Sequence, residues 1–249
     1  MWAMNECSAN GPATGLPDLD RWFEWFTDNA NAEDGVPWDA NDRLSGAERY
    51  CIERSIAAFQ LGEYSEGLSL MKFARVYAAE HGSAELVEIT RLFILEEQHH
   101  AGMLRRFMRQ HDIPVVKKNW TDTVFRRLRK NVGYELSITV LITAEIIALV
   151  YYRALAAATN SVVLQAICRK ILADERAHVH YESGLIRYIT SRHNLPRRIG
   201  TRALHDILFC GTVFVVYFEH RRVLVAGGFP RRGFWRAAWA EFRGYLHRQ

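Results

Sequence analysis

Two short segments, LEEQHH and ADERAHVH, place the same kinds of ionisable side chain at the same spacing. In each segment an acidic residue is followed by Glu-x-x-His, which pairs Glu97 with His100 and Glu175 with His178. Residues three apart lie on nearly the same face of an α-helix, so the carboxylate and the imidazole of each pair can bind one metal ion. Because apolar stretches surround both motifs, the fold has to place them on packed helices.

The spacing of apolar residues predicts an all-α fold. Four long stretches show the helical period, no convincing strand interrupts them, and Ser45 with Glu48 fits a capping box at the first. About twenty residues separate the second stretch from the third, and we expect a short basic helix at 121–130 within them. The predicted helices cover residues 45–81, 83–111, 134–159 and 162–193. A four-helix bundle with one long crossover connection has this layout.

A dinuclear metal site would need further carboxylates from the first and third helices. Glu145 is the only charged residue in the run ITAEIIALV, and burying it without a partner would cost several kcal/mol. With about 100° per residue, Glu63 lies on the apolar face of the first helix with Ile56 and Leu70. Glu66 lies about 60° to the side by the same period. We therefore take Glu63 as the ligand and keep Glu66 as the alternative.

Together these residues resemble the motif of the ferritin-like di-iron carboxylate superfamily, in which two helices each supply a Glu and two others a Glu-x-x-His. The Gly62-Glu63 pair is similar to the first-helix signature of rubrerythrins and aldehyde-deformylating oxygenases. The resemblance covers residues 45–193. It implies two iron ions, or manganese–iron or two manganese ions, bound by Glu63, Glu97, His100, Glu145, Glu175 and His178.

Four further polar residues lie next to the motifs. Glu96 and Asp174 precede the ligand glutamates, and each is a candidate to accept a hydrogen bond from a ligand histidine on another helix. The alternative for both is an ordinary acidic residue on a helix surface. We expect His99 and His180 beside the site or on the flank of the helices rather than on a metal.

The resemblance implies an O₂-dependent non-haem di-iron oxidoreductase that oxidises a small organic substrate by hydroxylation, N-oxygenation, desaturation or a similar step. Nearby apolar residues are expected to exclude water and line a pocket: Phe59, Phe93, Ile142, Ile146 and Leu149. No flavin or iron–sulfur motif is visible, so a separate electron donor or the substrate would supply electrons. Two alternatives stay open: a ferroxidase or other iron-handling protein, and a non-enzymatic helical binding protein.

We expect one domain over residues 1–249, with extensions at 1–44 and 196–249 and a short aromatic helix near 18–27. The C-terminal extension holds ten arginines and three acidic residues, a balance of +7 in a chain of net charge +4. It fits a helix packed over the bundle, a surface for an acidic carrier protein, or a membrane-surface segment in which aromatic residues alternate with arginines. No nucleic-acid motif accompanies the charge, and a homodimer is an open alternative.

The sequence favours a cytoplasmic location. The first residues lack the basic start and apolar run of a signal peptide. The four cysteines are far apart, without CxxC pairs, which suits a reducing interior. The run 136–155 is long enough to span a membrane, but Glu145 lies at its centre, so we interpret it as a buried core helix.

Overall fold

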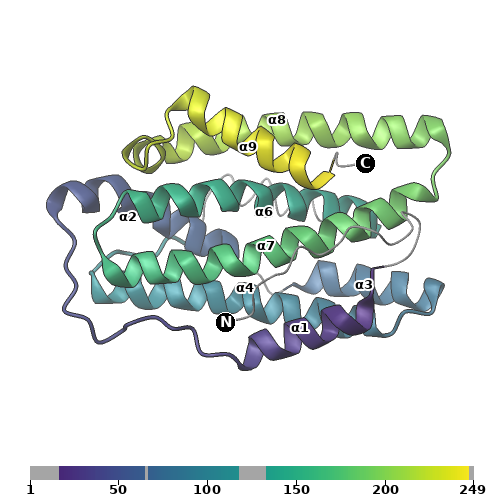
Figure 1. The fold of residues 1–249 in the computed structure, drawn as a ribbon, viewed down its shortest axis with the longest axis horizontal. Coiled ribbons are helices and arrows are strands. Elements are labelled where there is room, and N and C mark those ends of the chain that lie inside the picture. Colours follow the sequence, from purple (N-terminus) through teal and green to yellow (C-terminus); the bar gives the residue numbers. More distant parts are fainter. Residues whose placement is uncertain (1–16, 65–66, 118–132, 247–249) are drawn as a thin grey trace.

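The computed structural model describes residues 17–64, 67–117 and 133–246, and every regular element in these ranges is an α-helix (Figure 1). The described helices are α1 (Leu19–Asn31), α2 (Gly46–Glu63), α3 (Leu68–His81), α4 (Glu85–Gln110), α6 (Gly133–Ala157), α7 (Val162–Ser191), α8 (Leu195–Ala226) and α9 (Arg231–Leu246). This confirms the all-α prediction, including the short aromatic helix near residue 18. The basic helix expected at 121–130 lies outside the described ranges.

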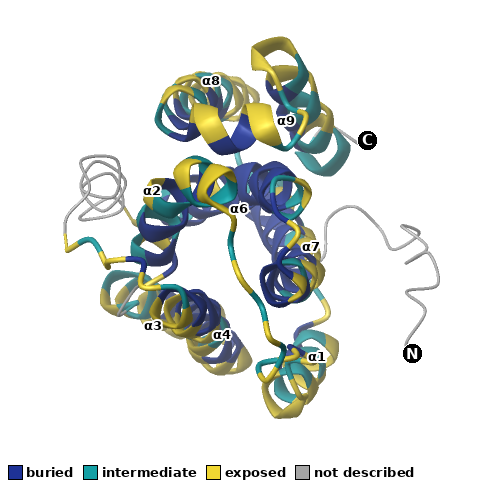
Figure 2. Cartoon of the chain, turned by 90° about the vertical axis from the view of Figure 1, so that its left-hand side faces the viewer, coloured by how far each residue is buried: buried dark blue, intermediate teal, exposed yellow. Residues whose placement is uncertain are grey.

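Helices α2, α4, α6 and α7 surround a common centre, with their buried sides facing it (Figure 2). At one end of these helices, Arg49 in α2 donates a hydrogen bond to the carbonyl oxygen of His111 after α4 (2.7 Å). At the same end, Glu48 accepts one from the backbone N–H of Asn160 between α6 and α7 (2.6 Å). Because α6 has 25 residues and ends near Asn160, it begins about 37 Å from this end of the helices. The start of α6 therefore lies at the opposite end of the helices from the end of α4.

The first long helix of the prediction is interrupted, so the expectation of one continuous helix over 45–81 is wrong. Helix α2 ends at Glu63, and α3 begins at Leu68 after Gly67. Gly67 has a φ of 64°, a left-handed conformation that suits glycine. A Cβ atom there would overlap the side chain of Ile94 in α4. The close approach of α4 and the backbone conformation explain why the chain turns here.

Helix α6 is the most enclosed of the described helices. Its most apolar 18-residue window has a mean hydropathy of 1.7 and is 89% buried, as expected for a core helix. Helix α8 also has the length and composition of a membrane span, but only 28% of its corresponding window is buried. Among the described residues, α6 and α8 are the two helices that are long and apolar enough to span a membrane.

The C-terminal extension forms a layer over α6 and α7, which agrees with the first of its three interpretations (Figure 1). The ring of Phe209 in α8 stacks on that of Phe242 in α9, with centroids 4.2 Å apart. Phe234 is also fully buried. Phe234 and Phe242 of α9 therefore face the protein, whereas Trp235 between them is 38% exposed.

The carboxylate of Glu48 connects the start of α2 to the turn between α6 and α7. It accepts hydrogen bonds from the backbone N–H groups of Ser45 (2.8 Å) and Asn160 (2.6 Å), and the Asn160 bond is the main reason that its pKa falls to about 2. Because this folded-state pKa lies below the unfolded one, the stabilisation is present above about pH 4.5 and is lost as the pH falls towards 2.

We expect Glu48→Gln to lower the free energy of unfolding by roughly 1 kcal/mol at pH 7, the usual cost of losing a helix cap. The difference from wild type should shrink between pH 4.5 and pH 2. Urea unfolding at several pH values measures both effects. Glu53→Gln, at an exposed ion pair with Arg49, is the control. Equal losses in the two variants at pH 7 would contradict the special role of Glu48.

Candidate metal centre

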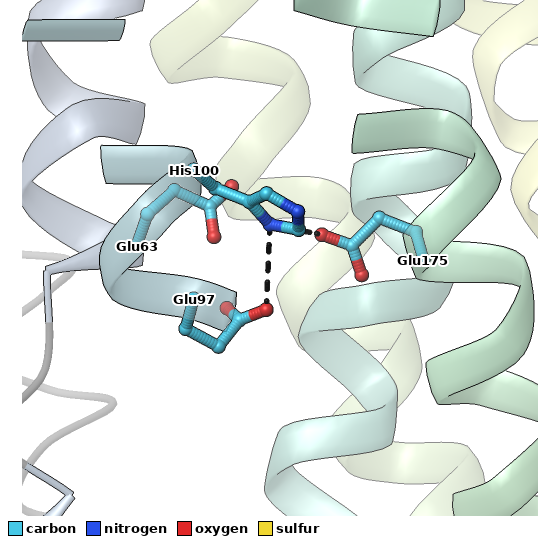
Figure 3. Close-up of side chains that lie close together, drawn as sticks. All are labelled: Glu63, Glu97, His100 and Glu175. Carbon is cyan, nitrogen blue, oxygen red and sulfur yellow. Dashed lines mark ion pairs between the residues drawn. The ribbon is translucent and has the colours of Figure 1, made fainter. Parts of the chain in front are cut away.

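The six ionisable residues of the sequence motifs all lie in the interior between four helices. Each is at most 8% exposed: Glu63 at the end of α2, Glu97 and His100 in α4, Glu145 in α6, and Glu175 and His178 in α7. Figure 3 shows the side chains of Glu63, Glu97, His100 and Glu175 pointing towards one another. The structure therefore brings together the side chains that were predicted from residues far apart in the sequence.

The ligand atoms fall into two overlapping groups. One consists of Glu63, Glu97, His100 and Glu175, and the other of Glu97, Glu145, Glu175 and His178. Within each group, one possible ligand atom per residue lies within 4.8 Å of the others. Glu97 and Glu175 belong to both groups. Each group could hold a metal ion.

Both histidines direct Nδ1 towards the shared carboxylates. His100 Nδ1 lies 3.5 Å from Glu97 and 3.7 Å from Glu175. His178 Nδ1 lies 3.3 Å from Glu97 and 3.4 Å from Glu175. In this arrangement the two imidazoles approach the same pair of carboxylates from different helices.

The unpartnered polar atoms of this interior fit a metal site. Among the described residues, Nδ1 of His100 and of His178, one oxygen of Glu97 and both oxygens of Glu175 are buried and have no hydrogen-bond donor or acceptor. Leaving such atoms unpaired usually costs about 1–3 kcal/mol each. Because these atoms all face one another, a cation between them would satisfy the whole set. The donor set of carboxylate oxygens and imidazole nitrogens is a common one for divalent metals.

The other ring nitrogen of each histidine is held by a carboxylate of the opposite helix. His100 Nε2 in α4 bonds Asp174 in α7 (2.9 Å), and His178 Nε2 in α7 bonds Glu96 in α4 (3.0 Å). A carboxylate at Nε2 makes that nitrogen the donor and leaves Nδ1 with a free lone pair for a metal. The expectation that Glu96 and Asp174 hold ligand histidines across helices agrees with this geometry.

Two residues outside the predicted set connect these carboxylates. Asn29 of α1 donates hydrogen bonds from its amide nitrogen to Glu96 and to Asp174, the latter at 3.0 Å. Lys170 of α7 donates to both oxygens of Asp174, at 2.7 and 2.6 Å. A third cluster with metal-ligand spacing, formed by Glu96, Asp174 and His100, is therefore already satisfied by protein donors. No sequence motif marks Asn29, because its partners lie 67 and 145 positions away.

Burial and crowding dominate the electrostatics of the site. Burial raises the pKa of Glu63, and burial together with the charge of Glu145 raises the pKa values of Glu97 and Glu175 well above the usual range. Burial alone would lower the pKa of His178, but its hydrogen bond to Glu96 raises this pKa to about 9. The metal-free site thus retains protons that a metal ion would displace.

Tyrosine and apolar side chains enclose the cluster. The hydroxyl of Tyr152, a fully buried residue, donates a hydrogen bond to Glu63. The rings of Phe93 and Phe26 pack against His178, with centroids 4.6 and 5.8 Å from it. Ile142 and Ile146 are fully buried in α6. The contacts of Phe26, Phe93 and Tyr152 shield part of the cluster, and the exclusion of water and a substrate pocket lined by the apolar residues stay predictions.

The remaining candidates from the sequence fall outside the cluster. His99 and His180 are exposed on α4 and α7 and belong to none of the metal-capable groups found among the described residues. Glu66 lies outside the described residues, and Glu63 occupies the first-helix position of the cluster.

No protein-family model matches this chain, and no curated protein or solved structure has significant similarity to it. What the cluster can bind therefore has to be inferred from its own atoms.

Glu175→Gln should stabilise the metal-free protein. Glu175 is fully buried with a strongly raised pKa, so its ionisation destabilises the fold as the pH rises above the unfolded-state value near 4.5. We expect the free energy of unfolding without metal to rise by roughly 1–3 kcal/mol at pH 8. Added Mn(II) should stabilise wild type and leave the variant almost unchanged.

Thermal unfolding with chelator and with Mn(II) tests both parts of this expectation. Glu80→Gln, which removes an exposed carboxylate of α3, is the control and should behave like wild type. A metal-free Glu175→Gln protein less stable than wild type would show that the carboxylate makes a stabilising contact instead.

Asn29→Ala should weaken metal binding without removing a ligand. Loss of a group that holds the partner of a ligand histidine typically costs 10–100-fold in affinity, and Asn29 contacts two such partners. Titration with Mn(II) measures the dissociation constant. The matched control is Asn31→Ala, since Asn31 lies in the same helix, is exposed, and bonds only the Thr27 carbonyl among the contacts described. Equal Mn(II) affinities of the two variants would show that Asn29 does not contribute to metal binding.

Proposed function

We propose that this protein is an O₂-dependent non-haem di-iron oxidoreductase with a ferritin-like bundle. The observation that carries the proposal is the pair of four-residue groups that share Glu97 and Glu175. Two groups with two carboxylates in common would hold two metal ions side by side, with Glu97 and Glu175 available to both. Glu63 with His100 would complete one coordination sphere, and Glu145 with His178 the other.

The helix arrangement supports the ferritin-like assignment. Helices α2 and α6 each supply one Glu, and α4 and α7 each supply a Glu-x-x-His. Ferritin-like di-metal proteins have this ligand distribution, with one long connection in the bundle. The end of α4 and the start of α6 lie at opposite ends of the bundle, as such a connection would require.

Charge and donor type favour two divalent first-row metals. Four carboxylates, when ionised, balance the charge of two divalent ions, so the filled site is electrically neutral in a buried environment where net charge is costly. Carboxylate oxygens with one imidazole per metal suit iron or manganese, whereas calcium takes only oxygen ligands. We favour two iron ions, and the same ligands accommodate manganese–iron or two manganese ions.

In this proposal the protein positions the ligands and keeps the site dry. Glu96 and Asp174 orient the two imidazoles, and the Tyr152 hydroxyl fixes one oxygen of Glu63. Phe26, Phe93 and the isoleucines of α6 limit access of water. A bound pair of ferrous ions supplies two electrons for the reduction of O₂. The apolar surroundings favour an organic substrate with an apolar part, and the remaining electrons would come from that substrate or from a separate donor.

The number of metal ions should depend on which glutamate is removed. We expect wild type, loaded anaerobically with Fe(II), to hold about two irons per chain, and Glu145→Ala or Glu63→Ala to hold about one. Glu97→Ala should hold less than either, because Glu97 belongs to both groups. Elemental analysis measures iron per chain, and Glu80→Ala provides an exposed-carboxylate control.

The reaction with O₂ then separates the candidate functions. Consumption of O₂ at a rate that depends on iron occupancy, without growth of a ferric mineral, would support the oxidoreductase. Mineral formation inside a large hollow assembly would favour iron storage. No bound iron or manganese in wild type after anaerobic loading would refute the di-metal site and leave a helical binding protein.

A further inference from the structure

The outer face of α8 carries four large apolar side chains that are more than half exposed. Leu204, Ile207, Phe214 and Phe218 are 51%, 69%, 53% and 51% exposed. They are spaced by three, seven and four residues, which places them along one side of the helix. Helix α8 forms the outermost layer of the molecule together with α9 (Figure 1 and Figure 2). We call these four residues and the exposed Gly211 between them the outer stripe.

The outer stripe is free of exposed charge over its whole length. From Arg202 to Arg221, the exposed positions of α8 between these two arginines are apolar residues or glycine. The two acidic residues of this stretch, Asp206 and Glu219, are half-buried. The stretch is about 27 Å long. An exposed apolar surface of this extent on a soluble fold usually marks an interaction site.

Arginines lie at both ends of the outer stripe. By the helical period, Arg197, Arg221 and Arg222 project from its side of α8, whereas Arg198 and Arg202 are aligned with the buried side. Exposed guanidinium groups come from both ends of α8 and from the start of α9: Arg197, Arg198, Arg202, Arg221, Arg222, Arg231, Arg232 and Arg236. In residues 195–246, where the structure is described throughout, no acidic side chain is fully exposed. The layer therefore presents an apolar centre with a positive border.

We infer that the outer stripe binds the surface of an anionic lipid bilayer, with α8 lying in the plane of the interface. An apolar helix face takes up the boundary between headgroups and acyl chains, and bordering arginines extend their guanidinium groups to lipid phosphates. The opposite face of α8 is occupied, since Phe209, Val213 and Val223 are buried against the protein. Helix α8 can therefore lie on a bilayer while it stays packed on the bundle.

The distribution of charge argues against other occupants of this surface. In an antiparallel pair of α8 helices centred on Gly211, the arginines at one end of each copy would face those at the opposite end of the other. In a parallel pair, each arginine would face its counterpart. Both dimers bring like charges together at both ends. An acidic protein would match the arginines but would leave the uncharged stripe facing polar side chains.

Vesicle binding by the full-length protein tests the inference. We expect wild type to float with vesicles of 70% phosphatidylcholine and 30% phosphatidylglycerol, with a partition coefficient at least tenfold higher than for phosphatidylcholine alone. Phe214→Ser with Phe218→Ser should lower the partition coefficient at least tenfold. Arg197→Gln, Arg221→Gln and Arg222→Gln together should remove most of the preference for anionic vesicles.

The matched control is Leu68→Ser with Val76→Ser, which removes two exposed apolar residues from α3, away from α8. It should bind vesicles like wild type, and circular dichroism should show the same helix content for all variants. Absence of binding to either vesicle would overturn the inference, as would binding that the phenylalanine variant leaves unchanged. A wild-type dimer that this variant converts to monomer would instead assign the stripe to a second copy of the chain.

Discussion

The cost of placing four glutamates in an apolar interior is the constraint around which this structure is organised. Glu63, Glu97, Glu145 and Glu175 are each at most 8% exposed and lie within reach of one another. Their mutual repulsion and loss of hydration would oppose folding unless protons or cations balance them. The two imidazoles provide part of that balance when protonated, because the hydrogen bonds to Asp174 and Glu96 raise their pKa values in spite of burial. A pair of divalent cations would provide the rest, which links the stability of the fold to the occupancy of the site.

The outer helices protect this interior. Helix α6 carries Glu145 and is enclosed on nearly all sides because α8 and α9 cover the face that the bundle leaves open. Helix α1 closes another side, where Phe26 packs on the ring of His178 and Asn29 connects Glu96 with Asp174. The two extensions that flank the bundle in the sequence are therefore part of the environment of the site.

Helical periodicity was enough to predict most of the helices and, together with the Glu-x-x-His motif, the side chains of the cluster, because both depend on local spacing. Glu63 was placed by its alignment with Ile56, and the structure puts it in the cluster although α2 ends there. The break itself could not be predicted, since it depends on the approach of Ile94 to Gly67 from another helix. Asn29 was missed for the same reason: its role comes from contacts across the fold. The outer stripe depends on which face of α8 the bundle covers, and that is decided by packing.

The reciprocal pairing of His100 with Asp174 and of His178 with Glu96 also sets the register of two helices. Each of α4 and α7 contributes one histidine and one carboxylate, so two hydrogen bonds join them in opposite senses. A shift of one residue in the register between the two helices would break both bonds together. It would also rotate the ligand faces by about 100°, away from each other. Apolar packing alone tolerates such small shifts more readily, because neighbouring apolar side chains can replace one another. The relative position of the two Glu-x-x-His motifs is thus specified before any metal arrives, and the ion meets ligands that are already aligned.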